Sequence, residues 1–170
     1  MLVEKRIRIV TLVVAFVAGG AGHAFAQRVG AGVSFLTESN ETAVGVSGDI
    51  RQHWFSMGPH LDVGIVVDGG YHQFQGFSVI SGQGGGRVTW RGLSRVQPYG
   101  QFTAGFEYCH LCQATNVITE PNVGVDVPIS TWRGTNVNLR ASFGVRSVWV
   151  NGGTFTEDRF WLGVSFGSGL

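Results

Sequence analysis

The chain has 170 residues, 27 of them Gly, and its 12 Lys and Arg against 11 Asp and Glu give a formal net charge of +1. Glycine at about twice its average usage argues against a helical protein. Five Trp, twelve Phe and three Tyr exclude a disordered chain, and the length excludes a dinucleotide-binding enzyme with a second substrate domain.

Residues 1–26 have the three parts of a cleaved secretory signal peptide. Lys5, Arg6 and Arg8 form a positive start, residues 9–18 form an apolar run too short to span a membrane, and Ala24-Phe25-Ala26 is a small-x-small cleavage site. We therefore expect a mature barrel domain over residues 27–170.

Removal of this segment takes away Lys5, Arg6, Arg8 and Glu4, so the net charge falls from +1 to −1 and no lysine remains. Such a chain has no basic surface for nucleic acid. No apolar run of the mature chain is long enough for a membrane-spanning helix.

Alternation of apolar and polar residues dominates the rest of the chain and predicts strands. In chain order the alternating segments cover residues 29–35, 44–50, 61–68, 78–90, 98–108, 122–129, 137–146 and 159–166. Ten residues tilted by about 40° rise about 25 Å, which matches the apolar band of an outer-membrane barrel. The predicted fold is all-β, an eight-stranded antiparallel up-and-down transmembrane barrel.

The alternation fits either a membrane barrel, apolar outside and polar inside, or a soluble exported barrel that binds an apolar ligand inside. The polar face favours the membrane barrel, because it is rich in Gly, Ser, Asn, Asp and Arg that suit a narrow lumen. Charges there must pair, and we expect a lumen network of Arg28, Asp49, Asp62, Arg87, Glu107, Asp126, Arg140, Arg146 and Arg159.

Aromatic residues favour the same interpretation, because they fall near both ends of the segments, as in the aromatic belts of membrane barrels. With a periplasmic N-terminus, the outer belt would hold Phe35, Tyr108, Trp149 and Phe160, and the periplasmic belt Trp54, Trp90, Trp132 and Phe166.

The connections are expected to alternate between outer loops at 37–41, 69–77, 109–121 and 150–157 and periplasmic turns at 52–58, 91–96 and 131–136. The two longest would be outer loops, and Glu38, Glu41, Glu120 and Glu157 would lie in the outer set.

In these features the chain resembles the small eight-stranded outer-membrane β-barrel superfamily of the OmpA/OmpX type. The resemblance covers the mature chain and includes the motifs at 84–90 and 98–106. It implies a bacterial outer-membrane location, contact with membrane lipid, and insertion by the barrel-assembly machinery. The last strand resembles the family's assembly signal, with Phe160, Leu162, Val164 and Phe166 at alternate positions, although residues 167–170 follow it.

Cys109-His110-Leu111-Cys112 could be a redox pair or half of a zinc site, but it lacks the context of either. In an exported protein we expect a local disulfide between Cys109 and Cys112 in an outer loop. No cofactor and no metal ion are expected.

A lipid A-modifying enzyme of this fold would need a His and a Ser near the outer rim with an acid partner. His72, Ser78 and Asp68 are the nearest candidates, but no spacing singles them out. No residue is therefore assigned as catalytic. The expected role is a non-enzymatic membrane scaffold that displays surface loops to an unidentified partner, with its lumen closed by the charge network.

Overall fold

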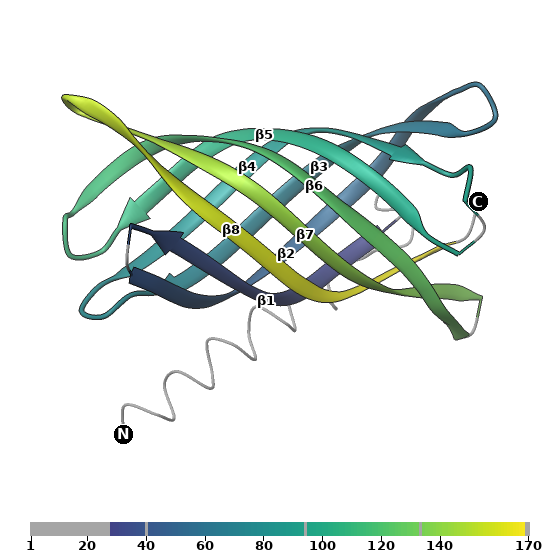
Figure 1. Ribbon diagram of the computed structural model, residues 1–170, viewed down its shortest axis with the longest axis horizontal. Helices are drawn as coiled ribbons and strands as arrows, with labels where there is room; N and C mark the ends of the chain where they lie inside the picture. Colours follow the sequence, from purple (N-terminus) through teal and green to yellow (C-terminus); the bar gives the residue numbers. More distant parts are fainter. Residues whose placement is uncertain (1–27, 40, 94, 133, 169–170) are drawn as a thin grey trace.

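The computed structural model describes residues 28–39, 41–93, 95–132 and 134–168. These residues form a closed antiparallel barrel in which each strand pairs with the next along the chain and β8 pairs back with β1 (Figure 1). The predicted fold is confirmed. The predicted signal peptide lies outside the described residues, as do residues 169 and 170, which follow the predicted assembly segment.

Seven of the eight strands are longer than the apolar alternation predicted, and β4 has the predicted bounds. They are β1 Arg28–Glu38, β2 Glu41–Met57, β3 Leu61–Gln73, β4 Ser78–Trp90, β5 Gln97–Cys109, β6 Ala114–Trp132, β7 Thr135–Val150 and β8 Gly153–Ser168. We call the end where β1 begins and β8 ends the terminal end, and the opposite end the far end (Figure 1).

The expected loop lengths are wrong. β3 continues to Gln73, β6 already begins at Ala114 and β8 at Gly153, so the outer loops expected at 69–77, 109–121 and 150–157 are short turns at the far end. The longest connection joins β4 to β5 at the terminal end. The apolar pattern fades toward the far end, whereas the backbone hydrogen bonds of the strands continue through polar residues.

The direction of the side chains is as predicted, with the apolar set outside and the polar set inside. Val123 is 63 % exposed and Phe106 62 %, while Arg146, Glu120 and Asp126 are fully buried inside the barrel. The expected aromatic residues also point outward near both ends, with Trp132 63 % exposed at the terminal end and Trp149 53 % at the far end. Within the described residues, no helix is long and apolar enough to cross a membrane.

One part of the interior is apolar, and the sequence did not predict it. At the far end Leu36, Ala43, Phe74 and Val79 form a buried cluster on the β1–β4 side of the barrel, with Phe77 packed against it. The rings of Phe74 and Phe77 stack with their centroids 4.6 Å apart. We call these five residues the apolar cap. Ile118 and Val148, on β6 and β7, are also fully buried toward this end.

Candidate functional site: the charged lumen

Asp126 of β6 is the centre of the charges in the terminal half of the lumen. Its carboxylate accepts hydrogen bonds from Arg140 Nε at 2.6 Å, Arg87 Nη2 at 2.8 Å and Arg51 Nη1 at 3.0 Å. A fourth guanidinium, that of Arg28, lies 3.6 Å away. Asp126 and Arg140 are direct cross-strand neighbours in the β6–β7 register, so local strand pairing alone brings these two together.

Asp49 extends this cluster to the opposite wall of the barrel. It pairs with Arg140 Nη1 at 2.6 Å and with Arg51 Nε at 2.7 Å. The guanidinium of Arg87 also stacks on the ring of Tyr99, with its Cζ atom 3.2 Å from the ring centroid. Ion pairs and an aromatic face therefore hold the arginines of this half of the lumen in place.

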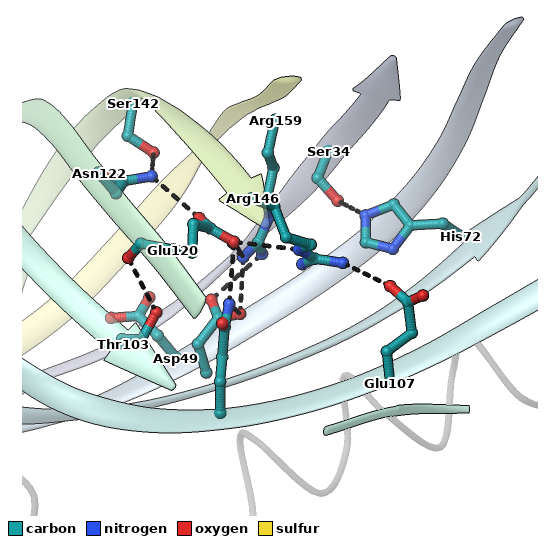
Figure 2. A network of polar contacts seen from close by, with 12 residues as sticks. Ser34, Asp49, His72, Thr103, Glu107, Glu120, Asn122, Ser142, Arg146 and Arg159 are labelled. Atoms are coloured by element: carbon teal, nitrogen blue, oxygen red, sulfur yellow. Dashed lines mark hydrogen bonds and ion pairs between the residues drawn. The ribbon is translucent and has the colours of Figure 1, made fainter. Parts of the chain in front are cut away.

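A second cluster occupies the far half and is centred on Glu120 (Figure 2). Arg146 contacts Glu107 at 3.0 Å, Glu120 at 3.3 Å and Glu157 at 3.8 Å. Arg159 pairs with Asp68 at 2.8 Å and shares Glu120 at 3.3 Å.

Neutral side chains complete the surroundings of Glu120. Gln83 Nε2 donates to Glu120 at 3.1 Å and Asn122 Nδ2 donates at 3.3 Å. Glu120 therefore has four hydrogen-bond donors around it, whereas Glu107 and Glu157 both face the single guanidinium of Arg146.

Together the two clusters contain as many arginines as acids, but the two signs are unevenly divided along the barrel axis. The terminal cluster holds Arg28, Arg51, Arg87 and Arg140 with Asp49 and Asp126. The far cluster holds Arg146 and Arg159 with Asp68, Glu107, Glu120 and Glu157. The terminal cluster therefore has an excess of arginines, and the far cluster has an excess of carboxylates.

Eight of the nine residues expected in the lumen network lie in these clusters, and Asp62 does not. Asp62 sits at the terminal end, where it pairs with Arg91, and His53 Nδ1 lies 4.0 Å away. The sequence interpretation missed Arg51, Asp68, Glu120 and Glu157 as network members. Arg51 continues the alternation that places Asp49 inside, so a longer predicted strand would have included it.

The prediction that Glu120 and Glu157 lie in outer loops is wrong. Both were expected in outer loops, but they are buried, at 0 % and 3 % exposure, on strands β6 and β8. Their phase matches that of Asn122 and Arg159, which also face inward.

The candidate catalytic set is not brought together as expected. His72 is fully buried in the lumen, and its Nε2 lies 2.6 Å from the hydroxyl of Ser34. Ser78 has the phase of the outward-facing Ile80, so it lies on the opposite face of the sheet from His72. Asp68 is engaged by Arg159 and Gln83. No triad of His72, Ser78 and Asp68 is therefore formed.

Cys109 and Cys112 lie at disulfide distance at the far end, across the turn between β5 and β6. Within the described residues, no group of three or more His, Cys, Asp or Glu side chains is arranged to hold a metal ion. Phe160, Leu162 and Phe166 of the predicted assembly segment are 43–45 % exposed on the outer face of β8, and Val164 shares their phase.

No family model matches the chain, and no curated protein is similar to it in sequence. Among solved structures, Neisserial surface protein A is similar with a TM-score of 0.57 and 16 % identity, over 84 % of this chain and 95 % of that one. The outer membrane enzyme PagL aligns over 84 % of this chain and 99 % of its own, with 13 % identity and a TM-score of 0.48. The Yersinia pestis outer membrane protein Ail aligns over 82 % and 98 %, with 12 % identity and a TM-score of 0.41.

The fold is thus that of the small eight-stranded outer-membrane β-barrels, and the resemblance inferred from the sequence is confirmed at this level.

Proposed function

We propose that this chain is an integral protein of the bacterial outer membrane, exported by its signal peptide and inserted by the barrel-assembly machinery. The observation that carries the proposal is the contrast between the two faces of the barrel. The outer face exposes Val123, Phe106 and Phe102 by more than half, while Arg146, Glu120 and Asp126 are buried inside. Lipid is the environment in which such an outer face is stable.

The proposed orientation puts the terminal end in the periplasm. The outward aromatic residues then lie at the two membrane–water interfaces, with Trp54, Trp90 and Trp132 on the periplasmic side and Tyr108 and Trp149 on the outer side. The outward apolar residues Phe160, Leu162, Val164 and Phe166 of β8 would be read by the assembly machinery.

The proposed role is non-enzymatic, a scaffold that presents the far-end hairpins to a surface partner. The Cys109–Cys112 pair would stiffen the β5–β6 hairpin in an oxidising compartment. The lumen is proposed to be closed, because both charge clusters and the apolar cap fill it. Eight strands leave little room for water once side chains occupy the interior.

The soluble alternative required the Val, Leu and Phe side chains to line an apolar cavity. These side chains point outward instead, so we do not propose an apolar ligand inside the barrel. A lipid-modifying activity through His72 lacks support, since its imidazole is fully buried and Ser78 lies on the other face.

Gel mobility of the outer-membrane fraction with and without boiling in SDS tests the location. A band in this fraction that shifts on boiling is expected, because a closed barrel resists SDS until it is heated. A protein found in the soluble periplasm with no shift would refute the proposal.

A further inference from the structure

A small cavity lies at the terminal end of the lumen, beside the cluster that has the excess of arginines. Its volume is about 60 Å³, and Arg28, Arg51, Arg87 and Arg91 line it together with His53 and Asp62. A single water molecule needs about 10–15 Å³ of cavity volume, so this cavity has room for several heavy atoms.

Two of the lining guanidinium groups have hydrogen-bonding capacity left over. Arg87 is 4 % exposed and Arg51 7 %. Among the described residues, neither Arg87 Nη1 nor Arg51 Nη2 finds a hydrogen-bond acceptor, although both atoms are buried. A buried N–H group without an acceptor is costly, so each of these two positions favours an additional acceptor.

The local charge balance indicates that this acceptor carries a negative charge. Asp126 and Asp49 are shared among Arg28, Arg51, Arg87 and Arg140, so two positive charges in this cluster remain uncompensated. At the rim Asp62 is paired with Arg91, which leaves the excess unchanged. The compensating acids lie in the far half of the lumen, on the other side of the clustered side chains.

We propose that this cavity binds a small free oxyanion of the phosphate or sulfate type, which enters from the terminal end. Guanidinium groups bind such anions with short, charge-assisted hydrogen bonds. Arg87 and Arg51 supply the unpaired donors, and Arg28 and Arg91 complete the positive lining. The apolar cap lies at the far end, so the apolar part of the interior is remote from this cavity.

The experiment measures inorganic phosphate binding to the folded barrel in maltoside micelles, by calorimetry and by ³¹P line broadening at low ionic strength. Saturable binding at one site per barrel is expected, with sulfate as a competitor. Arg87→Gln removes one unpaired donor and is expected to weaken binding about tenfold. Arg95→Gln is the matched control, because it removes the same charge from an exposed position in the β4–β5 connection outside the cavity.

Asp62→Asn keeps the test independent of any loss of folding. It removes the carboxylate from the lining, so phosphate should bind more tightly than to the wild type, and a poorly folded protein cannot produce a gain. Folding of each variant is checked by its gel mobility before boiling. The proposal is overturned if the folded wild type shows no saturable binding, if Arg95→Gln weakens binding as much as Arg87→Gln, or if Asp62→Asn leaves the affinity unchanged.

Discussion

Removal of the Glu120 carboxylate should destabilise the barrel strongly. Glu120 is fully buried and accepts hydrogen bonds from the guanidinium groups of Arg146 and Arg159 and from the amides of Gln83 and Asn122. Breaking a buried ion pair on one side typically costs about 3–5 kcal/mol. Loss of the Glu120 carboxylate would leave these four buried donors short of an acceptor.

Two features of the site place the expected cost near the lower end of this range. Arg146 keeps Glu107 at 3.0 Å and Arg159 keeps Asp68 at 2.8 Å, so neither guanidinium is left without a carboxylate. The far cluster also has more acids than arginines, so removal of one carboxylate reduces repulsion. We therefore expect Glu120→Ala to lower the free energy of unfolding by about 3 kcal/mol. Glu120→Gln keeps an acceptor oxygen and should cost about half as much.

The assay is reversible unfolding in urea of the barrel folded into phospholipid vesicles, followed by tryptophan fluorescence. Asp158→Ala is the control, because it removes an exposed carboxylate from β8 and should change the free energy by less than about 0.5 kcal/mol. If Glu120→Ala and Asp158→Ala had equal effects, the far cluster would contribute nothing to stability and our account of the lumen would be wrong.

Three further results follow from the two faces of the barrel and the filled lumen. Gly124→Leu should prevent stable folding, because a Cβ atom at Gly124 would lie 2.5 Å from the ring of Tyr99. Gly82→Leu, at an outward position with open space around it, should fold and show the wild-type gel shift on boiling. Val123→Arg, at the middle of β6, should lower the free energy of unfolding in vesicles by about 2–4 kcal/mol. Thr115→Arg near the far end should cost about 1 kcal/mol or less, and equal costs would contradict a membrane-spanning β6. The wild-type barrel should give no ion-conductance steps in a planar bilayer, and regular steps would show that the lumen is open.

The direction of nearly every strand residue could be predicted from the sequence, because the period of two fixes the face of each side chain. The same rule, applied to the cross-strand pair of Asp126 and Arg140, was enough to put both charges in the lumen. What it cannot supply is the height of a residue along the barrel axis, which depends on the stagger between strands. The partners of Arg159, on β3 and β6, were unpredictable for this reason.

The ends of the strands also could not be predicted from the sequence. Glu120 and Glu157 were assigned to loops because the apolar half of the pattern is weak around them. A lumen-facing position requires only a polar residue, so the pattern there no longer distinguishes a strand from a loop. The apolar cap was missed for a related reason, since Leu36 and Val79 face inward where polar residues were expected.

The order of strand pairing has a consequence for how the barrel folds. Each strand is joined to its next neighbour by a turn, but the seam between β1 and β8 pairs Arg28 with Gly167, near the two ends of the barrel domain. Closure of so long a loop is entropically slow, so we expect the seam to form last. The ion pairs of Arg140 with Asp49 and of Arg159 with Asp68 join strands that are not neighbours in the sheet. Until the seam closes, these side chains remain hydrated in an open trough, so closure and the pairing of the charges form one cooperative step.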